Sequence, residues 1–211
     1  MDAIIGISFV LIDMTSPGVS TRPIRLISGK SPFCETFFDR VQVPVGQLVG
    51  TLNDGWTVAK YLLQHEREMI GAIGERQSAK ALGRSALDAL GADASGRLAD
   101  PVLRADIARF EVDEAAFRAW MKMAPEQARA GEASPALSSA LKYYGAELNK
   151  RRWELMMALG GADALEWEGA RSGDGTVART WLRTKANSIE GGTSEVQLNV
   201  IAKRILGLPG V

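Results

Sequence analysis

Hydrophobic positions divide the chain into a short strand-like region and a long helical region. Before residue 53, β-branched and aromatic residues gather in short runs separated by turn-forming Thr, Ser, Pro and Gly. After residue 53, hydrophobic residues recur every three or four positions, which is typical of helices that pack on one side. The first region predicts strands over 7–12, 22–27 and 36–43. The second predicts helices over 54–90, 101–129, 135–160, 177–187 and from 195 onward.

These elements predict a mainly α protein, in which an antiparallel four-helix-type bundle follows a partial β-domain of about three strands. The helices should run antiparallel because the connections between them are short. We expect two domains: residues 1–52 as the C-terminal part of a β-domain, and residues 53–211 as the helical bundle. Asp100 and Pro101 match an N-cap and the first residue of a helix, so one helix should begin there.

The last helix and the turn before it form the most distinctive segment. Ser194 and Gln197 fit an S-x-x-Q capping box, which predicts a helix that begins near Glu195. Hydrophobic residues then recur at spacings of three and four and predict one buried face: Leu198, Ile201, Ile205 and Leu208. Gly191 and Gly192 precede the helix, and glycines there let a ligand approach backbone amides closely. An ordinary loop and helix cap would explain the same residues.

A carboxylate lies on the apolar stripe of the first predicted helix. Glu66 falls between hydrophobic residues that recur at three and four: Trp56, Ala59, Leu63, Ile70 and Ile73. Burial disfavours the charged form of a carboxyl group and raises its pKa, which suits a general base that works near neutrality. An ion pair at the edge of the bundle is the alternative interpretation of Glu66, and Arg67 is its neighbour in sequence.

Composition excludes several classes of function. Lys and Arg together number 25, as do Asp and Glu, so nothing favours a nucleic-acid or anionic-membrane partner. One cysteine and one histidine argue against a disulfide framework and against a Cys- or His-based metal site. No apolar run approaches the roughly 20 residues of a membrane helix, and no secretory signal is visible. The cytoplasm is therefore the expected location.

The segment Ser188-Ile189-Glu190-Gly191-Gly192-Thr193-Ser194-Glu195 resembles the C-terminal signature of the acyl-CoA dehydrogenases, especially a bacterial branch with a Gly-Gly-Thr-Ser-Glu turn. Residues 6–56, 100–110 and 140–165 resemble further parts of that family, in the same order. The resemblance implies the C-terminal half of an FAD-dependent enzyme that removes an α-proton from an acyl-CoA thioester and passes the β-hydride to FAD. It also implies a homo- or hetero-oligomer that donates electrons to an electron-transfer flavoprotein or a similar acceptor.

The same resemblance implies roles for individual residues. The family's commoner base position, just before Gly-Thr, corresponds to Gly191, whereas the other position, a Glu-Arg pair on the first long helix, corresponds to Glu66 and Arg67. Glu66 is thus the expected base, with Glu190 as the alternative, and Arg67 is expected to bind substrate. The Gly191 amide would bind the thioester oxygen. The remaining matches are expected to contact FAD: Gly160, Gly161, Gly192, Thr193 and Glu195.

The chain departs from the family by starting partway through the middle β-domain. The family's N-terminal helical domain and the first part of its β-domain have no counterpart here. Three expectations follow: a portion of a complete enzyme, one chain of a split heteromeric enzyme, or a non-catalytic helical interaction module. For Gly160 and Gly161, a helix C-cap is an interpretation that is compatible with a cofactor contact.

Overall fold

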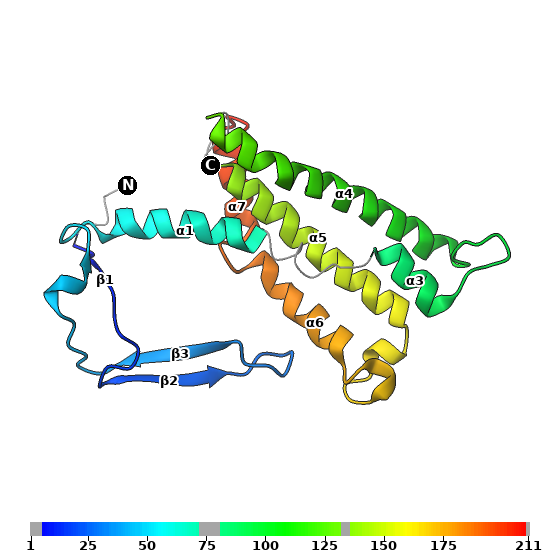
Figure 1. Cartoon of the computed structure of the whole chain (residues 1–211), viewed down its shortest axis with the longest axis horizontal. Helices are drawn as coiled ribbons and strands as arrows, with labels where there is room; N and C mark the ends of the chain where they lie inside the picture. Colours follow the sequence, from blue (N-terminus) through cyan, green and yellow to red (C-terminus); the bar gives the residue numbers. More distant parts are fainter. Residues whose placement is uncertain (1–5, 72–80, 132–135, 210–211) are drawn as a thin grey trace. The chain divides into compact units, whose positions relative to one another are not determined.

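The computed structural model describes residues 6–71, 81–131 and 136–209, with the side chains of residues 64, 66–71 and 128 outside the description. The chain divides into two compact units, residues 1–66 and 67–211 (Figure 1). The predicted domain division at residues 52 and 53 stays a prediction.

The first unit contains two small antiparallel sheets. Strands β1 (Phe9–Val10) and β4 (Leu48–Val49) pair with Phe9 opposite Val49. Strands β2 (Val19–Ile24) and β3 (Phe33–Phe38) form a hairpin in which Val19 lies opposite Phe38. A 3₁₀ turn, η1 (Val45–Gln47), precedes β4. Helix α1 (Gly55–Gly71) begins after Asp54, whose carboxylate accepts a hydrogen bond of 2.8 Å from the Thr57 hydroxyl.

The predicted strands are observed as strands, but with different boundaries. The second and third observed strands each begin three residues earlier than predicted. The Leu26 amide donates a hydrogen bond to the Lys30 carbonyl, so the chain turns where the second strand was expected to continue. The sequence pattern missed β4, which is only two residues long. Almost all residues of β2 and β3 are exposed, as a hairpin from a partial β-domain would be.

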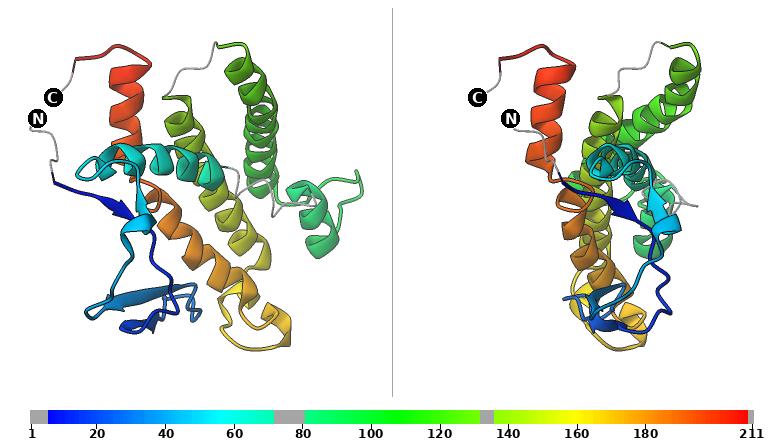
Figure 2. Two further views of the ribbon diagram at one scale, coloured as in Figure 1. Left: turned by 60° about the vertical axis from the view of Figure 1, so that its left-hand side comes forward. Right: turned by 90° about the vertical axis from the view of Figure 1, so that its left-hand side faces the viewer.

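The second unit is a bundle arranged around one central helix. Its long helices are α4 (Pro101–Arg129) and α5 (Leu137–Gly160), and the shorter ones are α3 (Leu82–Leu90), α6 (Thr176–Thr184) and α7 (Ser194–Arg204). Helix α5 packs against α3, α4, α6 and α7 (Figure 2). Three 3₁₀ turns complete the unit: η2 (Asp163–Leu165), η3 (Ala170–Ser172) and η4 (Lys185–Ser188). The mainly α fold class is therefore confirmed.

The core of the second unit lies between α3, α4 and α5. Its buried hydrophobic residues include Leu82, Ala86, Ile107, Phe110, Phe117, Leu141, Leu148, Leu155 and Leu159. Asp100 accepts hydrogen bonds from the amides of Val102 and Leu103, so the predicted N-cap of α4 is confirmed. The predicted helix start at Pro135 lies outside the described residues.

The prediction of one helix up to Leu90 was wrong. Ala81 is extended, with a ψ of 139°, and α3 begins after it as a separate helix. The Gly83 amide donates a hydrogen bond of 2.7 Å to the Glu111 carboxylate on α4. A carboxylate from another helix thus satisfies an amide in the first turn of α3, which favours a helix start at this point. Sequence periodicity alone does not reveal such a tertiary contact.

Candidate functional site at the turn before α7

The turn that joins η4 to α7 has a backbone that only glycine adopts readily. Gly191 and Gly192 have φ values of +65° and +93°, in the region that disfavours side chains. A Cβ atom at Gly192 would lie 2.5 Å from the Gln197 side-chain nitrogen. Thr193 then returns to extended geometry and precedes the first residue of α7. Glycine is therefore required at residue 192 both for its φ value and for space.

The predicted capping box of α7 was wrong. Thr193, rather than Ser194, is the N-cap, and its hydroxyl accepts a hydrogen bond of 3.3 Å from the Val196 amide. The Gln197 side chain is buried and donates to the carbonyls of Gly191, at 3.0 Å, and Gly192, at 3.3 Å. Because a buried side-chain amide needs acceptors for its N–H groups, Gln197 bonds to the glycine carbonyls and is not directed at the N-cap.

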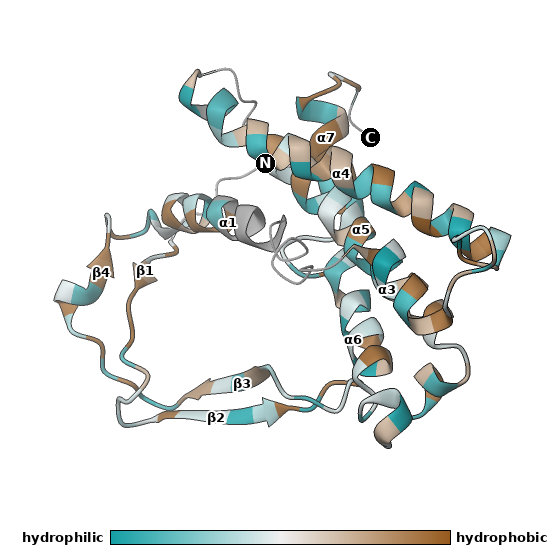
Figure 3. Ribbon diagram, turned by 45° about the vertical axis from the view of Figure 1, so that its right-hand side comes forward, coloured by the Kyte–Doolittle hydropathy of each residue, from teal (hydrophilic) through white to brown (hydrophobic). Residues whose placement is uncertain are grey.

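The predicted buried face of α7 was also wrong for this chain. Leu198 and Leu208 are 45% and 52% exposed, and Ile205 is exposed as well. Ser194 and Gln197 are the buried residues of α7, because the helix packs on α5 with polar residues near its N-terminus. Figure 3 shows hydrophobic positions on α7. The spacing identified a real apolar stripe, but within the described chain only Ile201 of its four residues is even half-buried.

A buried lysine holds the turn from the side of α5. Lys142 is 0% exposed, and its Nζ donates to the Gly192 carbonyl at 2.7 Å and to the Asn187 carbonyl at 3.0 Å. Burial lowers the pKa of Lys142 below its ordinary value, while the nearby carboxylates of Glu190 and Glu147 oppose that shift. The ammonium group thus bridges two carbonyls that flank residues 188–191.

Sequence reasoning missed Lys142, although a signal for it existed. Lys142 lies seven residues before Asn149, and both share a stripe of α5 with buried Leu141, Gly145 and Leu148. A lysine and an asparagine on the buried stripe of a helix need polar partners. That pattern would have predicted a polar network against α5, but not which loop supplies the other half.

Glu190 is held by two donors on the same side of the turn. Arg183 donates to one carboxylate oxygen at 2.8 Å, and the Asn187 amide donates to the other at 2.5 Å. The Asn149 amide in turn donates to the Asn187 side-chain oxygen at 2.9 Å. The Glu190 side chain is 21% exposed. Both oxygens of this carboxylate are therefore engaged in holding the turn against α5 and α6.

The amides of the turn face away from these anchors. In a trans peptide the C=O and N–H groups point in opposite directions. Gln197 binds the Gly191 carbonyl and Lys142 binds the Gly192 carbonyl, so the N–H groups of Gly192 and Thr193 are directed to the opposite side. Among the described residues, no hydrogen bond is donated by the amides of 191–193. The turn can therefore accept a carbonyl or anionic oxygen beside a helix N-terminus.

The α7 cap gives a pH-dependent prediction. Hydrogen bonds from its own amide and from the Thr193 hydroxyl lower the pKa of Glu195. A lowered pKa stabilises the fold above the unfolded-state pKa, and this contribution is lost as pH falls through the folded-state value. We expect Thr193→Ala to raise the Glu195 pKa and to cost about 1 kcal/mol of unfolding free energy near neutrality, with a smaller cost at acidic pH.

Carboxyl-detected NMR titration and urea unfolding at several pH values would measure both effects. Thr193→Ser keeps the hydroxyl and should preserve the Glu195 pKa. A Glu195 pKa that is unchanged in Thr193→Ala would contradict the cap.

The Gly160-Gly161 pair ends α5 as a C-cap. The Gly161 amide donates to the carbonyls of Met157, at 3.1 Å, and Ala158, at 3.3 Å, and Gly161 has a φ of +51°. A Cβ at Gly160 would lie 2.6 Å from the Ala164 Cβ, so close packing requires this glycine. Both residues are exposed, and their contact with a cofactor stays a prediction.

Glu66 and Arg67 belong to α1, but their side chains lie outside the described residues. Their positions relative to Gly191 therefore stay predictions. Two hydrophobic residues of the same predicted stripe are exposed: Trp56, in the first turn of α1, and Leu63, at its middle.

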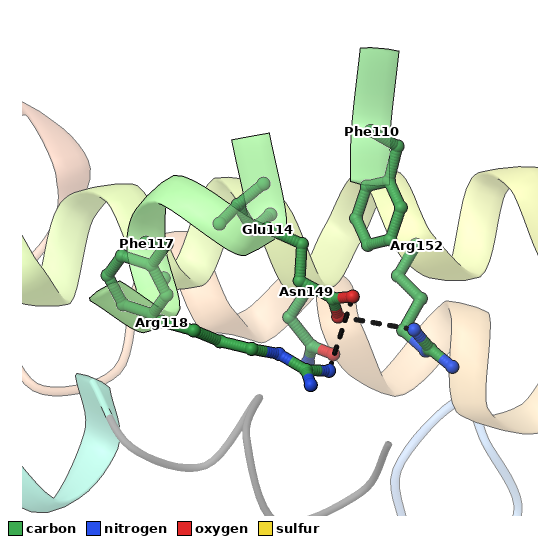
Figure 4. A pocket seen from close by; sticks show the side chains of 8 residues that line it. Phe110, Glu114, Phe117, Arg118, Asn149 and Arg152 are labelled. Atoms are coloured by element: carbon green, nitrogen blue, oxygen red, sulfur yellow. Dashed lines mark hydrogen bonds and ion pairs between the residues drawn. The ribbon is translucent and has the colours of Figure 1, made fainter. Parts of the chain in front are cut away.

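A separate pocket between α4 and α5 holds paired charges (Figure 4). Glu114 lies between Arg118, at 3.2 Å, and Arg152, at 3.3 Å, and Phe110 and Phe117 line the same pocket. Asn149 also lines the pocket, so it connects this cluster to the network around Asn187. The carboxylate compensates the guanidinium groups, and the cluster joins the two long helices.

Comparison with known proteins identifies the class of this domain. Residues 53–206 match the family model described as the acyl-CoA dehydrogenase C-terminal domain. The chain therefore belongs to the acyl-CoA dehydrogenase family, as the signature turn indicated. None of the described helices is long and apolar enough to cross a membrane.

Individual relatives agree with this assignment. The chain is 34% identical to acyl-CoA dehydrogenase FadE34 of Mycobacterium tuberculosis, over 97% of this chain and 27% of that protein. It is 31% identical to acyl-CoA dehydrogenase IpdE1 of Mycolicibacterium smegmatis, over 97% of this chain and 50% of that protein. The chain thus spans half or less of the length of these two relatives.

Solved structures show the same fold. The Tcur3481-Tcur3483 steroid ACAD superimposes with a TM-score of 0.80 at 26% identity, covering 97% of this chain and 52% of the other. The ChsE4-ChsE5 complex from Mycobacterium tuberculosis superimposes with a TM-score of 0.74 at 27% identity, covering 98% and 53%. Each of these proteins is named by two components.

Proposed function

We propose that this chain is the C-terminal portion of an FAD-dependent acyl-CoA dehydrogenase that introduces a double bond between the α and β carbons of an acyl-CoA thioester. The observation that carries the proposal is the turn at 190–193. The amides of residues 191–193, which donate to no described residue, lie beside the N-terminus of α7, while buried donors hold the carbonyls of the turn. Such an arrangement suits an oxygen atom on which negative charge develops.

In this proposal, Glu66 accepts the α-proton and the amide of Gly191 binds the thioester oxygen that gains enolate-like charge. Arg67 binds the substrate next to the base. The bonds from Arg183 and Asn187 to Glu190 support Glu66 over Glu190, because they fix the Glu190 carboxylate against the turn, whereas a base must be aimed at the proton it accepts. FAD, when bound, accepts the β-hydride.

The residues present fit an FAD site of this family. The unpaired amides of Gly192 and Thr193 are available to oxygen atoms, and the space beside Gly161 is open where a Cβ would project. Gly160, Glu195 and these three residues are proposed as cofactor contacts. The hydrogen bonds of the Thr193 and Glu195 side chains lie within the cap of α7, so they do not prevent these two residues from contacting a cofactor.

A heteromeric enzyme is the form we favour. Each of the two solved structures named above is a protein of two named components, and this chain spans about half of one chain in each of them. We propose that this chain belongs to one component of such a complex, and that residues 1–52 belong to its β-domain while 53–211 form its helical domain. Electrons would leave through an electron-transfer flavoprotein or a similar acceptor. A steroid-derived acyl-CoA is the first substrate class to test, since one of these structures is a steroid ACAD.

The proposal is tested by isolating the chain from its natural host together with whatever copurifies. We expect a yellow assembly that contains this chain, FAD and a second component. Reduction of the flavin by a panel of fatty and steroid acyl-CoA thioesters would then identify the substrate class. A colourless protein that takes up no FAD, alone or with its copurifying chains, would indicate the non-catalytic helical module instead.

A further inference from the structure

We propose that Lys142 is a positioning residue that orients and polarises the amides of the turn at 190–193; the catalytic part of this inference rests on the proposed function. Lys142 is fully buried, and its ammonium group contacts the turn through backbone oxygens. An isolated buried ammonium is unfavourable, so its retention requires partners. Here those partners are the carbonyls of Asn187 and Gly192.

The carbonyls of Asn187 and Gly192 lie on either side of residues 188–191, the segment whose conformation positions the amides of the turn. One ammonium group, with three donors, bonds to Asn187 before residues 188–191 and to Gly192 after them. The chain between these points includes Gly191, which has no Cβ and therefore no strong intrinsic preference for the positive φ that it adopts here. Lys142 therefore fixes both ends of this segment through their carbonyls, and Gln197 adds hydrogen bonds to the carbonyls of Gly191 and Gly192.

The charge also acts through the peptide bond. The Gly192 carbonyl and the Thr193 amide belong to one planar peptide unit. A cation 2.7 Å from the carbonyl oxygen draws electron density toward that oxygen, which strengthens the N–H on the far side as a donor. Gln197 has the same geometric effect on the preceding peptide with a neutral amide. Lys142 thus contributes orientation and charge without itself reaching a ligand.

Lys150 provides a matched control on the same helix. It is 21% exposed, and its Nζ bonds to the Ser188 hydroxyl at 2.8 Å and to the Glu147 carboxylate at 2.8 Å. Lys150 therefore lies in the same neighbourhood and bonds to side chains, whereas Lys142 bonds to the carbonyls of the turn. Lys142→Met and Lys150→Met each remove one ammonium group and keep a similar chain length.

The first test needs only this chain and does not depend on FAD. In ¹⁵N-labelled protein, Lys142→Met should shift the amide signals of residues 191–193 and lower their order parameters, whereas Lys150→Met should leave them in place. Unchanged signals in folded Lys142→Met would overturn the proposal. If that variant does not fold, Lys142→Gln keeps a neutral donor, and the unaltered chain should itself show a slowly exchanging Lys142 ammonium signal. A rapidly exchanging signal would overturn the proposal as well.

The second test uses the FAD-containing assembly. Lys142→Met should lower the rate constant of flavin reduction by about 100-fold, because the Gly191 amide loses its fixed orientation toward the thioester oxygen, with less than about a threefold change in acyl-CoA affinity. Lys142→Gln should be intermediate, and Lys150→Met should stay within about threefold of the unaltered enzyme. An unchanged reduction rate, or a loss confined to affinity, would overturn the catalytic role. Failure to bind FAD would count against the proposed function alone, and the NMR test would still decide whether Lys142 orients the turn.

Discussion

Glu66→Gln should lower the rate constant of flavin reduction by acyl-CoA about 10³-fold while FAD stays bound. A glutamine keeps the shape of the side chain but cannot accept the α-proton, and general-base catalysis contributes about 10² to 10⁴ in rate. The loss should fall on the chemical step, because the acyl-CoA is held by other groups. Stopped-flow absorbance of the flavin in the assembled enzyme would measure this rate, and the flavin spectrum would report FAD content.

Two controls make the assignment of the base specific. Glu68→Gln changes a carboxylate two positions further along α1, on a different side of the helix, and should have little effect. Glu190→Gln removes the rival carboxylate but retains an oxygen for Arg183, so we expect a loss of no more than about tenfold. If Glu190→Gln abolished reduction and Glu66→Gln did not, Glu190 would be the base.

Gly192→Ala should lower the free energy of unfolding by about 3 kcal/mol. The φ of +93° costs an alanine about 1–3 kcal/mol, and the new Cβ would lie 2.5 Å from the Gln197 nitrogen. Gln197 would have to move, and each of its two bonds to the turn is worth about 1 kcal/mol. Urea unfolding followed by circular dichroism would measure the change from the shift in midpoint at constant slope.

Gly207→Ala is the matched control for backbone strain. Gly207 also has a positive φ, +64°, but a Cβ there would meet no atom within 4 Å. Its substitution should therefore cost only the strain, about 1 kcal/mol. Equal effects at Gly192 and Gly207 would show that the contact with Gln197 contributes nothing, and would contradict the crowded geometry of the turn.

Much of the helical architecture was predictable because local chemistry determines it. Asp100 and Pro101 marked the start of α4 through capping, and the Gly160-Gly161 pair marked the end of α5 through its φ preference. The Gly191-Gly192 turn was recognisable for the same reason, since few other residues adopt its backbone. The sequence of residues 188–195 also indicated the family, and the comparison with known proteins confirmed it.

The tertiary structure decided where side chains make their bonds. Gln197 matched half of a capping box in the sequence, yet its side chain bonds to the glycine carbonyls. The predicted helix up to Leu90 is interrupted at Ala81, and Glu111 of α4 binds an amide in the first turn of α3. Lys142 appeared to be one of many lysines until folding placed its ammonium group between two carbonyls that are 45 and 50 residues away in sequence. Periodicity and capping preferences report contacts within a few residues, whereas a buried polar group is satisfied by whichever distant backbone the fold brings to it.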